Sequence, residues 1–266
     1  MIPKRIHYCW FGGNAKPRLA EKCIASWKRF CHDYEFVEWN ENNVDLNDCP
    51  EYVRQAYAMK KWAFVTDYVR LKVVYENGGI YLDTDVELLK SLDELLRCRA
   101  FLGCEGTDYV NTGLGFGAEA NLSFLRKNMA VYEKLEPLDE KGNFVSSPCP
   151  HYTTAVLKEK GVVFPIRKIT HSPDGLTIYP NVFINPYDWK TEKLHCTEDT
   201  FSIHHYSGSW MTESQRKGFI QRAKSEQIEH HFGKTAAKLY EVCFWARKKN
   251  GGPGLVAWFV RKLQRY

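Results

Sequence analysis

Apolar positions recur with two different periods over the first part of the chain. "RIHYCWFGG" (residues 5–13) is typical of a β-strand that runs into a glycine turn. "PRLAEKCIASWKRF" (17–30) carries its apolar residues at helical spacing, and "YEFVEWNENN" (34–43) indicates a second strand that ends in a polar turn. A strand–helix–strand opening favours an α/β fold.

The pattern continues with helices and short strands. Residues 50–77 predict a long helical stretch that breaks near Ala58–Lys60 and stops at Gly78–Gly79, followed by a strand over Ile80–Asp83. "RAFLGCE" (99–105) and "NTGLGFGAEA" (111–120) indicate a strand pair, and "LSFLRKNMAVYEKL" (122–135) a helix. The region 142–200 mixes short strands with loops. We therefore expect one α/β domain over 1–210 and a helical extension over 211–266 that packs on it.

The charge distribution and the cysteines indicate which partners and which cellular compartment to expect. The net charge of +5 is uneven, because residues 211–266 carry a surplus of +8 and the first 210 residues carry −3. A basic tail of this kind suggests contact with something anionic. The nine cysteines are scattered without a C-x-x-C pair, which argues against a zinc knuckle or a disulfide framework and for a reducing cytoplasm. We expect neither a signal peptide nor a membrane span.

Two aspartates stand where a buried strand ends, in "ENGGIYLDTDVELL" (76–89). In an extended chain Tyr81, Asp83 and Asp85 share a face, and two neighbouring carboxylates repel each other unless a cation or hydrogen bonds hold them. Such oxygen ligands suit Mg²⁺ or Mn²⁺ bound together with phosphates. A surface turn with two acids is the simpler alternative.

The preceding helix adds polar residues to an otherwise apolar segment. At helical spacing Ala63, Asp67, Arg70 and Val74 share one face. Asp67 and Arg70 either form a simple ion pair on the helix or form a polar face that meets a sugar or diphosphate beside the metal. The residues alone leave both interpretations open.

"AFVTDYVRLKVVYENGGIYLDTDV" (63–86) resembles the signature of the sugar-binding D-x-D glycosyltransferases of family 32, in which S/T-D-x-x-R runs into G-G-x-Y-x-D-x-D. That family includes capsular polysaccharide synthesis enzymes and, more distantly, is similar to the glucosyltransferase domain of the large clostridial cytotoxins. The matching positions are Thr66, Asp67, Arg70, Gly78, Gly79, Tyr81, Asp83 and Asp85. The resemblance implies a GT-A-type nucleotide-binding fold with a mixed, mostly parallel central sheet flanked by helices.

Two outer segments extend the resemblance. "IPKRIHYCWFGG" (2–13) is similar to the family's first strand, which assigns Trp10 to stacking on the nucleotide base, although a core tryptophan is the alternative. "IHHYSGSW" (203–210) is similar to the closing loop, in which a histidine is the third metal ligand and Ser209 and Trp210 touch the diphosphate. Of the two histidines we choose His205 over His204. An imidazole ligand favours Mn²⁺ over Mg²⁺.

The resemblance also implies roles for individual residues. Asp85 and His205 hold the ion, and Asp83 contacts the ribose and metal-bound water. Arg70 adds positive charge near the sugar or diphosphate, and Asp67 accepts hydrogen bonds from sugar hydroxyls. The remaining implied contacts are those of Tyr81 with the phosphates and of Asn111, in "VNTGLGFG" (110–117), with the donor sugar.

The implied activity is metal-dependent, retaining transfer of a hexose from a nucleotide diphosphate sugar, most simply a UDP-sugar, to a glycan or lipid-linked saccharide in surface or capsular polysaccharide synthesis. The alternatives are a haloacid dehalogenase-like phosphatase, whose D-x-D begins with a nucleophilic aspartate, and a non-catalytic nucleotide-sugar-binding module. The tail either attaches the protein to an anionic membrane at the inner face of the plasma membrane or caps the domain. No nucleic-acid-binding module is recognisable.

Overall fold

The computed structural model describes residues 1–208 except 146, 173 and 189–192, and scattered residues between 218 and 240. The chain divides into two compact units, Met1–Ser207 and Gly208–Tyr266. In the second unit Ile228, Ala237 and Tyr240 form a small apolar cluster, and the described residues other than Gly208 and Gly233 are helical. The predicted packing of residues 211–266 on the rest of the chain stays a prediction.

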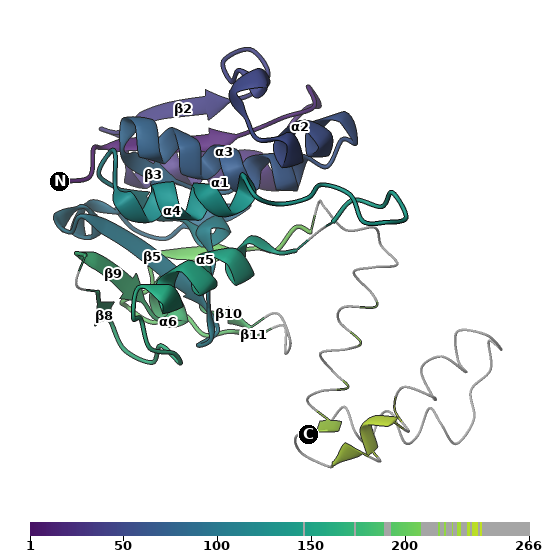
Figure 1. Ribbon diagram of the computed structural model, residues 1–266. Coiled ribbons are helices and arrows are strands. Elements are labelled where there is room, and N and C mark those ends of the chain that lie inside the picture. The colour runs from purple at the N-terminus through teal and green to yellow at the C-terminus, as the bar shows by residue number, and fades with distance from the viewer. Residues whose placement is uncertain are drawn as a thin grey trace. The chain divides into compact units, whose positions relative to one another are not determined.

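The first unit is built on an eight-stranded sheet (Figure 1). Its order is β2 (Glu35–Trp39), β1 (Arg5–Cys9), β3 (Gly79–Tyr81), β7 (Phe116–Ala118), β5 (Ala100–Glu105), β9 (Leu176–Tyr179) and β8 (Thr170–His171), with β6 (Tyr109–Val110) pairing with β5. Strands β2, β1, β3, β5 and β9 run in one direction, and β7, β8 and β6 run in the other. The expected mixed, mostly parallel sheet is confirmed.

Helices cover both faces of this sheet. On one face lie α2 (Glu51–Ala58), α3 (Trp62–Asn77), α4 (Ser123–Tyr132) and α5 (Cys149–Glu159), packed on Tyr81 and Leu102 (Figure 1). On the other lie α1 (Arg18–Phe30) and α6 (Asn181–Ile184), packed on Ile80 and Phe101. Because successive strand residues point to opposite faces, neighbours such as Ile80 and Tyr81 serve different cores.

Most predicted elements are confirmed, with three differences. The break between the two helices falls at residues 59–61, one residue later than predicted, and Lys60 there has a positive φ of 56°. Helix α3 ends at Gly78 (φ 66°), as predicted. Strand β3 ends at Tyr81, two residues earlier than expected. The region 142–200 contains the eleven-residue helix α5, where only short strands and loops were predicted. Two further ribbons are β10 (Tyr187–Asp188) with β11 (Lys193–Leu194), and β4 (Val86–Leu88) with β12 (Ser202–His204).

No helix among the described residues combines the length and apolar character that crossing a bilayer requires.

Candidate metal and sugar-nucleotide site

The two aspartates lie in a turn between β3 and β4. The amide of Val86 donates to the carbonyl of Asp83 (2.9 Å), which closes a tight turn directly after the buried strand. β12 pairs antiparallel with β4 and places His204 opposite Val86. As a result Asp83, Asp85 and His204 each offer a ligand atom within 4.8 Å of the others. Two carboxylates and an imidazole are a donor set that fits Mn²⁺, and fits Mg²⁺ less well.

The structure brings His204, and not the predicted His205, to the two aspartates. His204 Nε2 lies 3.2 Å from Asp85 Oδ1, whereas His205 Nε2 lies 2.8 Å from Glu87 Oε2, outside the cluster. Neighbouring residues at the end of a strand point to opposite sides, so only one of two adjacent histidines can face the aspartates. His205 contributes its backbone instead, because its amide donates to the carbonyl of Asp85 (3.0 Å).

Helix α3 supplies a buried guanidinium to the same cluster. Arg70 Nη2 lies 3.1 Å from Asp67 Oδ1 and 3.2 Å from Asp83 Oδ1, and the Arg70 side chain is only 4% exposed. The Tyr81 hydroxyl donates to Asp83 Oδ1 (2.9 Å), and the Thr66 hydroxyl accepts a hydrogen bond from Arg70 (3.2 Å). Asp67 and Arg70 therefore do pair with each other, as the simple interpretation held, and the pair also holds Asp83 in place.

Burial and charge set the protonation of these groups in opposite directions. Burial raises the pKa of Asp67 to about 6 against the pull of Arg70, and it also raises the pKa of Asp83. Burial alone would raise the pKa of Asp85, but His204 and the Ser207 amide, which donates to Asp85 Oδ2 (2.9 Å), hold it well below its usual range. Asp85 in turn raises the pKa of His204 despite burial of the imidazole.

A polar network continues from the cluster toward α5 and β5. Asn111 donates to Glu105 Oε2 (2.8 Å) and accepts from the Gly113 amide (2.7 Å) and from the Cys149 thiol (3.4 Å). Arg70 Nη1 lies 3.6 Å from Cys149 Sγ. Asn111 was predicted, whereas Glu105 and Cys149 were not. The sequence offered one signal for Glu105, which is an acidic residue at the end of a predicted strand. It offered none for Cys149, because the helix that contains Cys149 was not predicted.

Of the remaining predicted residues, the structure describes Trp10 but not Ser209 and Trp210. Trp10 follows β1 at the sheet edge where β3 also ends, is partly exposed rather than in the core, and donates to the carbonyl of Asn14 (2.6 Å). Its base-stacking role stays a prediction. Ser209 and Trp210 lie outside the described residues.

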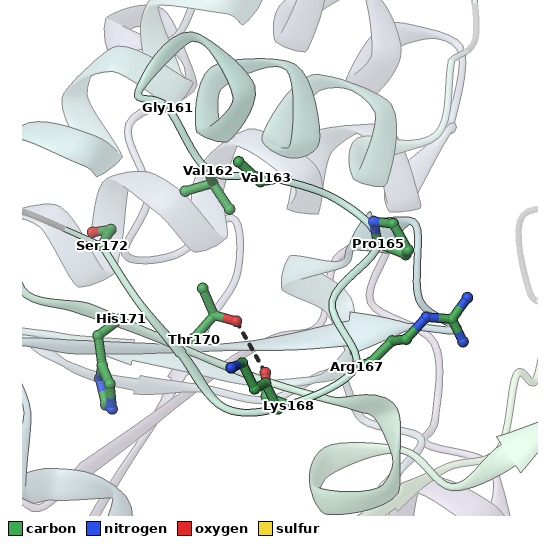
Figure 2. A pocket seen from close by; sticks show the side chains of 9 residues that line it. All are labelled: Gly161, Val162, Val163, Pro165, Arg167, Lys168, Thr170, His171 and Ser172. Carbon is green, nitrogen blue, oxygen red and sulfur yellow. Dashed lines mark hydrogen bonds between the residues drawn. The ribbon is translucent and has the colours of Figure 1, made fainter.

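A separate cleft of about 450 Å³ lies beyond the end of α5 (Figure 2). It is lined by the loop over residues 161–172, including Arg167, Lys168 and His171, and Thr170 donates there to the carbonyl of Lys168 (3.0 Å). None of the residues of the metal cluster lines this cleft, so it carries no part of the candidate site.

Comparison with known proteins finds a family match over the segment that contains the two aspartates. Residues 17–102 match the family model described as "Glycosyltransferase sugar-binding region containing DXD motif". This stretch contains α3, β3, Asp83 and Asp85. Over this stretch the chain is therefore similar to the sugar-binding region of D-x-D glycosyltransferases.

Two curated relatives agree with this. The chain is 32% identical over 107 residues to inositol phosphoceramide mannosyltransferase 3 of Schizosaccharomyces pombe, covering 38% of this chain and 29% of that protein. It is 27% identical over 125 residues to the uncharacterized glycosyltransferase L373 of Acanthamoeba polyphaga mimivirus, covering 43% of this chain and 50% of that protein. The chain thus spans half or less of the length of these relatives.

Solved structures show looser likeness. The PaToxG glycosyltransferase aligns with a TM-score of 0.45 and 19% identity over 59% of this chain and 69% of that one. A glycosyltransferase involved in glycosylation of the major capsid of PBCV-1 aligns with a TM-score of 0.42 and 14% identity over 82% of this chain and 98% of that one. TM-scores below 0.5 indicate only a loose similarity.

Proposed function

We propose that the protein is a metal-dependent, retaining glycosyltransferase that moves a hexose from a UDP-sugar to a hydroxyl of a glycan or lipid-linked saccharide. The observation that carries this proposal is the convergence of Asp83, Asp85 and His204 from two distant segments, one of which lies within the family match. In the reaction the bond between the anomeric carbon and the diphosphate oxygen breaks, and a bond to the acceptor oxygen forms. The products are the glycoside, UDP and a proton.

Asp83, Asp85 and His204 would hold Mn²⁺ or Mg²⁺, with the imidazole favouring manganese. Such an ion supplies positive charge at the oxygens of the departing diphosphate. The protein's own contribution is to fix the ligands. Arg70 and Tyr81 both hold Asp83 Oδ1, and the Ser207 amide holds Asp85 Oδ2. Because Arg70 and Asp67 are almost fully buried and paired, we assign them to holding Asp83 rather than to contacting the sugar.

The test is a thermal-shift screen of the full chain against UDP, UDP-glucose, UDP-galactose, UDP-N-acetylglucosamine and GDP-mannose, with and without Mn²⁺. A ligand that binds only the native state raises the unfolding temperature by mass action. We expect a Mn²⁺-dependent rise with a UDP-sugar, and Asp85→Asn should abolish it. The matched control is Glu87→Gln, a neighbouring carboxylate outside the cluster. Mn²⁺-independent binding, or full binding by Asp85→Asn, would contradict the metal role.

Two alternatives remain to be tested with the same protein. A phosphatase of the haloacid dehalogenase type would hydrolyse p-nitrophenyl phosphate, and the comparisons do not favour it. A non-catalytic module would bind the nucleotide sugar and Mn²⁺ without releasing UDP over time. We expect slow donor hydrolysis by the wild-type protein, which neither alternative produces.

We further propose that the protein acts in the cytoplasm and meets its acceptor at an anionic membrane surface. The support is the charge of residues 211–266, whose surplus of +8 contrasts with −3 in the remainder of the chain. Basic segments gain about 1 kcal/mol per Lys or Arg close to such a surface. The acceptor would then be a saccharide on a lipid carrier.

A further inference from the structure

We propose that Glu105 accepts hydrogen bonds from hydroxyls of the transferred sugar, and that Asn111 and Tyr206 hold its carboxylate in position for this. This inference rests on the proposed function and adds a specificity-determining residue to it. Neither the D-x-D segment nor the matching helix contains Glu105, which ends strand β5.

The position of Glu105 in the sheet places it near the metal cluster. β3 and β5 run in the same direction, with β7 between them, so their carboxyl ends meet at one edge of the sheet. Ligands of open α/β sheets bind at this edge. Asp83 and Asp85 follow β3, and Glu105 is the last residue of β5.

A continuous set of contacts links Glu105 to the cluster on both sides. On one side Glu105 accepts from the Asn111 amide (2.8 Å), and Asn111 reaches Arg70 through the Cys149 thiol. On the other side burial and the nearby Glu105 carboxylate raise the pKa of the Tyr206 hydroxyl, and the Tyr206 ring stands edge-on against the His204 ring with centroids 4.3 Å apart. Asn111 thus holds the Glu105 carboxylate, and Tyr206 links the surroundings of Glu105 to the His204 ring.

Tyr206 is positioned by more than this one bond. The buried amide of Asn185 donates to the Tyr206 hydroxyl (2.8 Å), which leaves the hydroxyl proton for another acceptor, and we assign the nearby Glu105 carboxylate to that place. The Tyr206 backbone has a φ of 47°, a conformation that costs an aromatic residue about 1–3 kcal/mol and tends to persist at functional sites. The backbone is thus strained at a residue whose ring packs against His204 and whose hydroxyl lies near Glu105.

Glu105 has free acceptor capacity and access to solvent. A carboxylate offers about four lone-pair directions; Asn111 uses one of them, and the proposed bond from Tyr206 would use a second. Glu105 is partly exposed, and among the described residues no lysine or arginine forms an ion pair with it. Asp67, by contrast, has a side chain that is 10% exposed and paired with Arg70. Glu105 is thus the more accessible acceptor for hydroxyl groups beside the cluster.

The charge of Glu105 decides which part of the donor it contacts. A carboxylate repels a diphosphate, whereas a hexose is neutral and presents several hydroxyl donors. Hydrogen bonds from neutral donors to a carboxylate are stronger than those between neutral groups. Since the diphosphate is assigned to the Asp83, Asp85 and His204 side, the neighbouring Glu105 side is left for the sugar.

The test compares nucleotides with and without their sugar. Dissociation constants in Mn²⁺ are measured by calorimetry for UDP-glucose, UDP-galactose, UDP-N-acetylglucosamine and GDP-mannose, and for the matched UDP and GDP. For the best donor we expect Glu105→Gln to weaken the sugar nucleotide by about ten- to a hundred-fold, the worth of a charged hydrogen bond, and to leave the bare nucleotide unchanged. Tyr206→Phe should give a smaller loss of the same kind, and Glu105→Asp should recover part of it.

The outcomes separate this inference from the proposed function. Glu119→Gln is the matched control, because its carboxylate, which pairs with Arg99 and the N-terminus, follows the oppositely directed strand β7. Equal weakening of nucleotide and sugar nucleotide by Glu105→Gln, or no change in either, overturns the sugar contact while the proposed function stands. An unchanged donor affinity with a raised KM for the acceptor overturns it also. If the wild-type protein binds none of the nucleotides, the proposed function fails and the inference fails with it.

Discussion

At the scale of single residues, the peptide of Gly113 lies between the groups that define the candidate site. A Cβ at this position would stand 2.6 Å from Asp83 Oδ2, 3.0 Å from Asn111 Oδ1 and 3.1 Å from Arg70 Nη1. The φ of Gly113 is outside the left-handed region, so alanine fits its backbone and any effect comes from the added methyl group. Glycine is thus needed here for space rather than for conformation.

We therefore expect Gly113→Ala to displace the Asp83 carboxylate. The affinity for Mn²⁺, measured by calorimetry in the presence of UDP, should fall by about tenfold or more, while the overpacked site loses roughly 1–3 kcal/mol of stability. Gly117→Ala is the control, because its Cβ would meet Phe101 at 2.5 Å in the apolar core and should cost stability without changing the affinity for Mn²⁺. Equal Mn²⁺ affinity in both variants would contradict the assignment.

The residues of the site differ in how far the sequence could predict them. Asp83, Asp85, Asp67 and Arg70 are local to one helix–turn–strand segment, so their spacing was enough to group them. The choice between His204 and His205 depends on the register in which β12 pairs with β4. The residues around the two histidines do not determine that register. Glu105 joins the site through pairing of strands that are distant in sequence.

At the scale of elements, His7 ties the first strand to its surroundings. Its imidazole lies in β1 with no exposed surface, and Nε2 lies 2.8 Å from the carbonyl of Gly78, at the end of α3. Trp39, on the neighbouring β2, donates to Nδ1 (3.0 Å), so the ring is neutral with its proton on Nε2. Burial is the main cause that lowers the pKa of His7, from 6.5 to about 4.

This pKa shift makes the stability of the fold depend on pH. Between about pH 6.5 and pH 4 the unfolded chain binds a proton on His7 that the folded chain does not bind. The contribution is therefore fully present above pH 6.5 and is lost as the pH falls toward 4, by roughly 3 kcal/mol in total. Urea unfolding of wild type and His7→Gln at pH 4.5–7.5 measures it.

We expect the wild type to lose more stability than His7→Gln over this pH range, because the variant lacks the titrating group. His32→Gln, at an exposed histidine, should retain the wild-type dependence. Superimposable pH profiles for wild type and His7→Gln would show that His7 is protonated in the folded protein as readily as in the unfolded one.

Some helices and strands could be predicted from the sequence pattern, and others could not. The opening strand–helix–strand unit and α3 have clear periodicity and stop signals, and they form as predicted. Helix α5 was missed because Pro148, Pro150 and the surrounding polar residues suggested a loop, although proline is tolerated in a first helical turn. Thr153, Val156 and Leu157 do show helical spacing, and all three are buried. The strand after Gly79 ends early because the backbone must turn to direct both aspartates toward β12.

At the scale of the whole molecule, charge is divided along the chain in the same way as function is proposed to be. The mildly acidic first 210 residues contain the candidate site, and the basic remainder contains the expected membrane contact. A purely electrostatic contact with lipid should depend on the number of charges and on ionic strength, since exposed charges are screened beyond about 8 Å at 0.15 M salt. It should not depend on the candidate metal site.

We expect the full chain to sediment with vesicles that contain phosphatidylserine at low salt and to be released at about 0.5 M NaCl, where the Debye length is only a few ångströms. Substituting Arg247, Lys248 and Lys249 together by glutamine should weaken vesicle binding by about 3 kcal/mol, or roughly a hundred-fold. The matched control replaces three exposed lysines of the first unit, Lys127, Lys134 and Lys158. Both triple variants lose the same net charge, so only a contact made through the tail separates them. Equal vesicle binding by the two would assign the attraction to overall charge instead, and no binding by the wild type would end the membrane proposal.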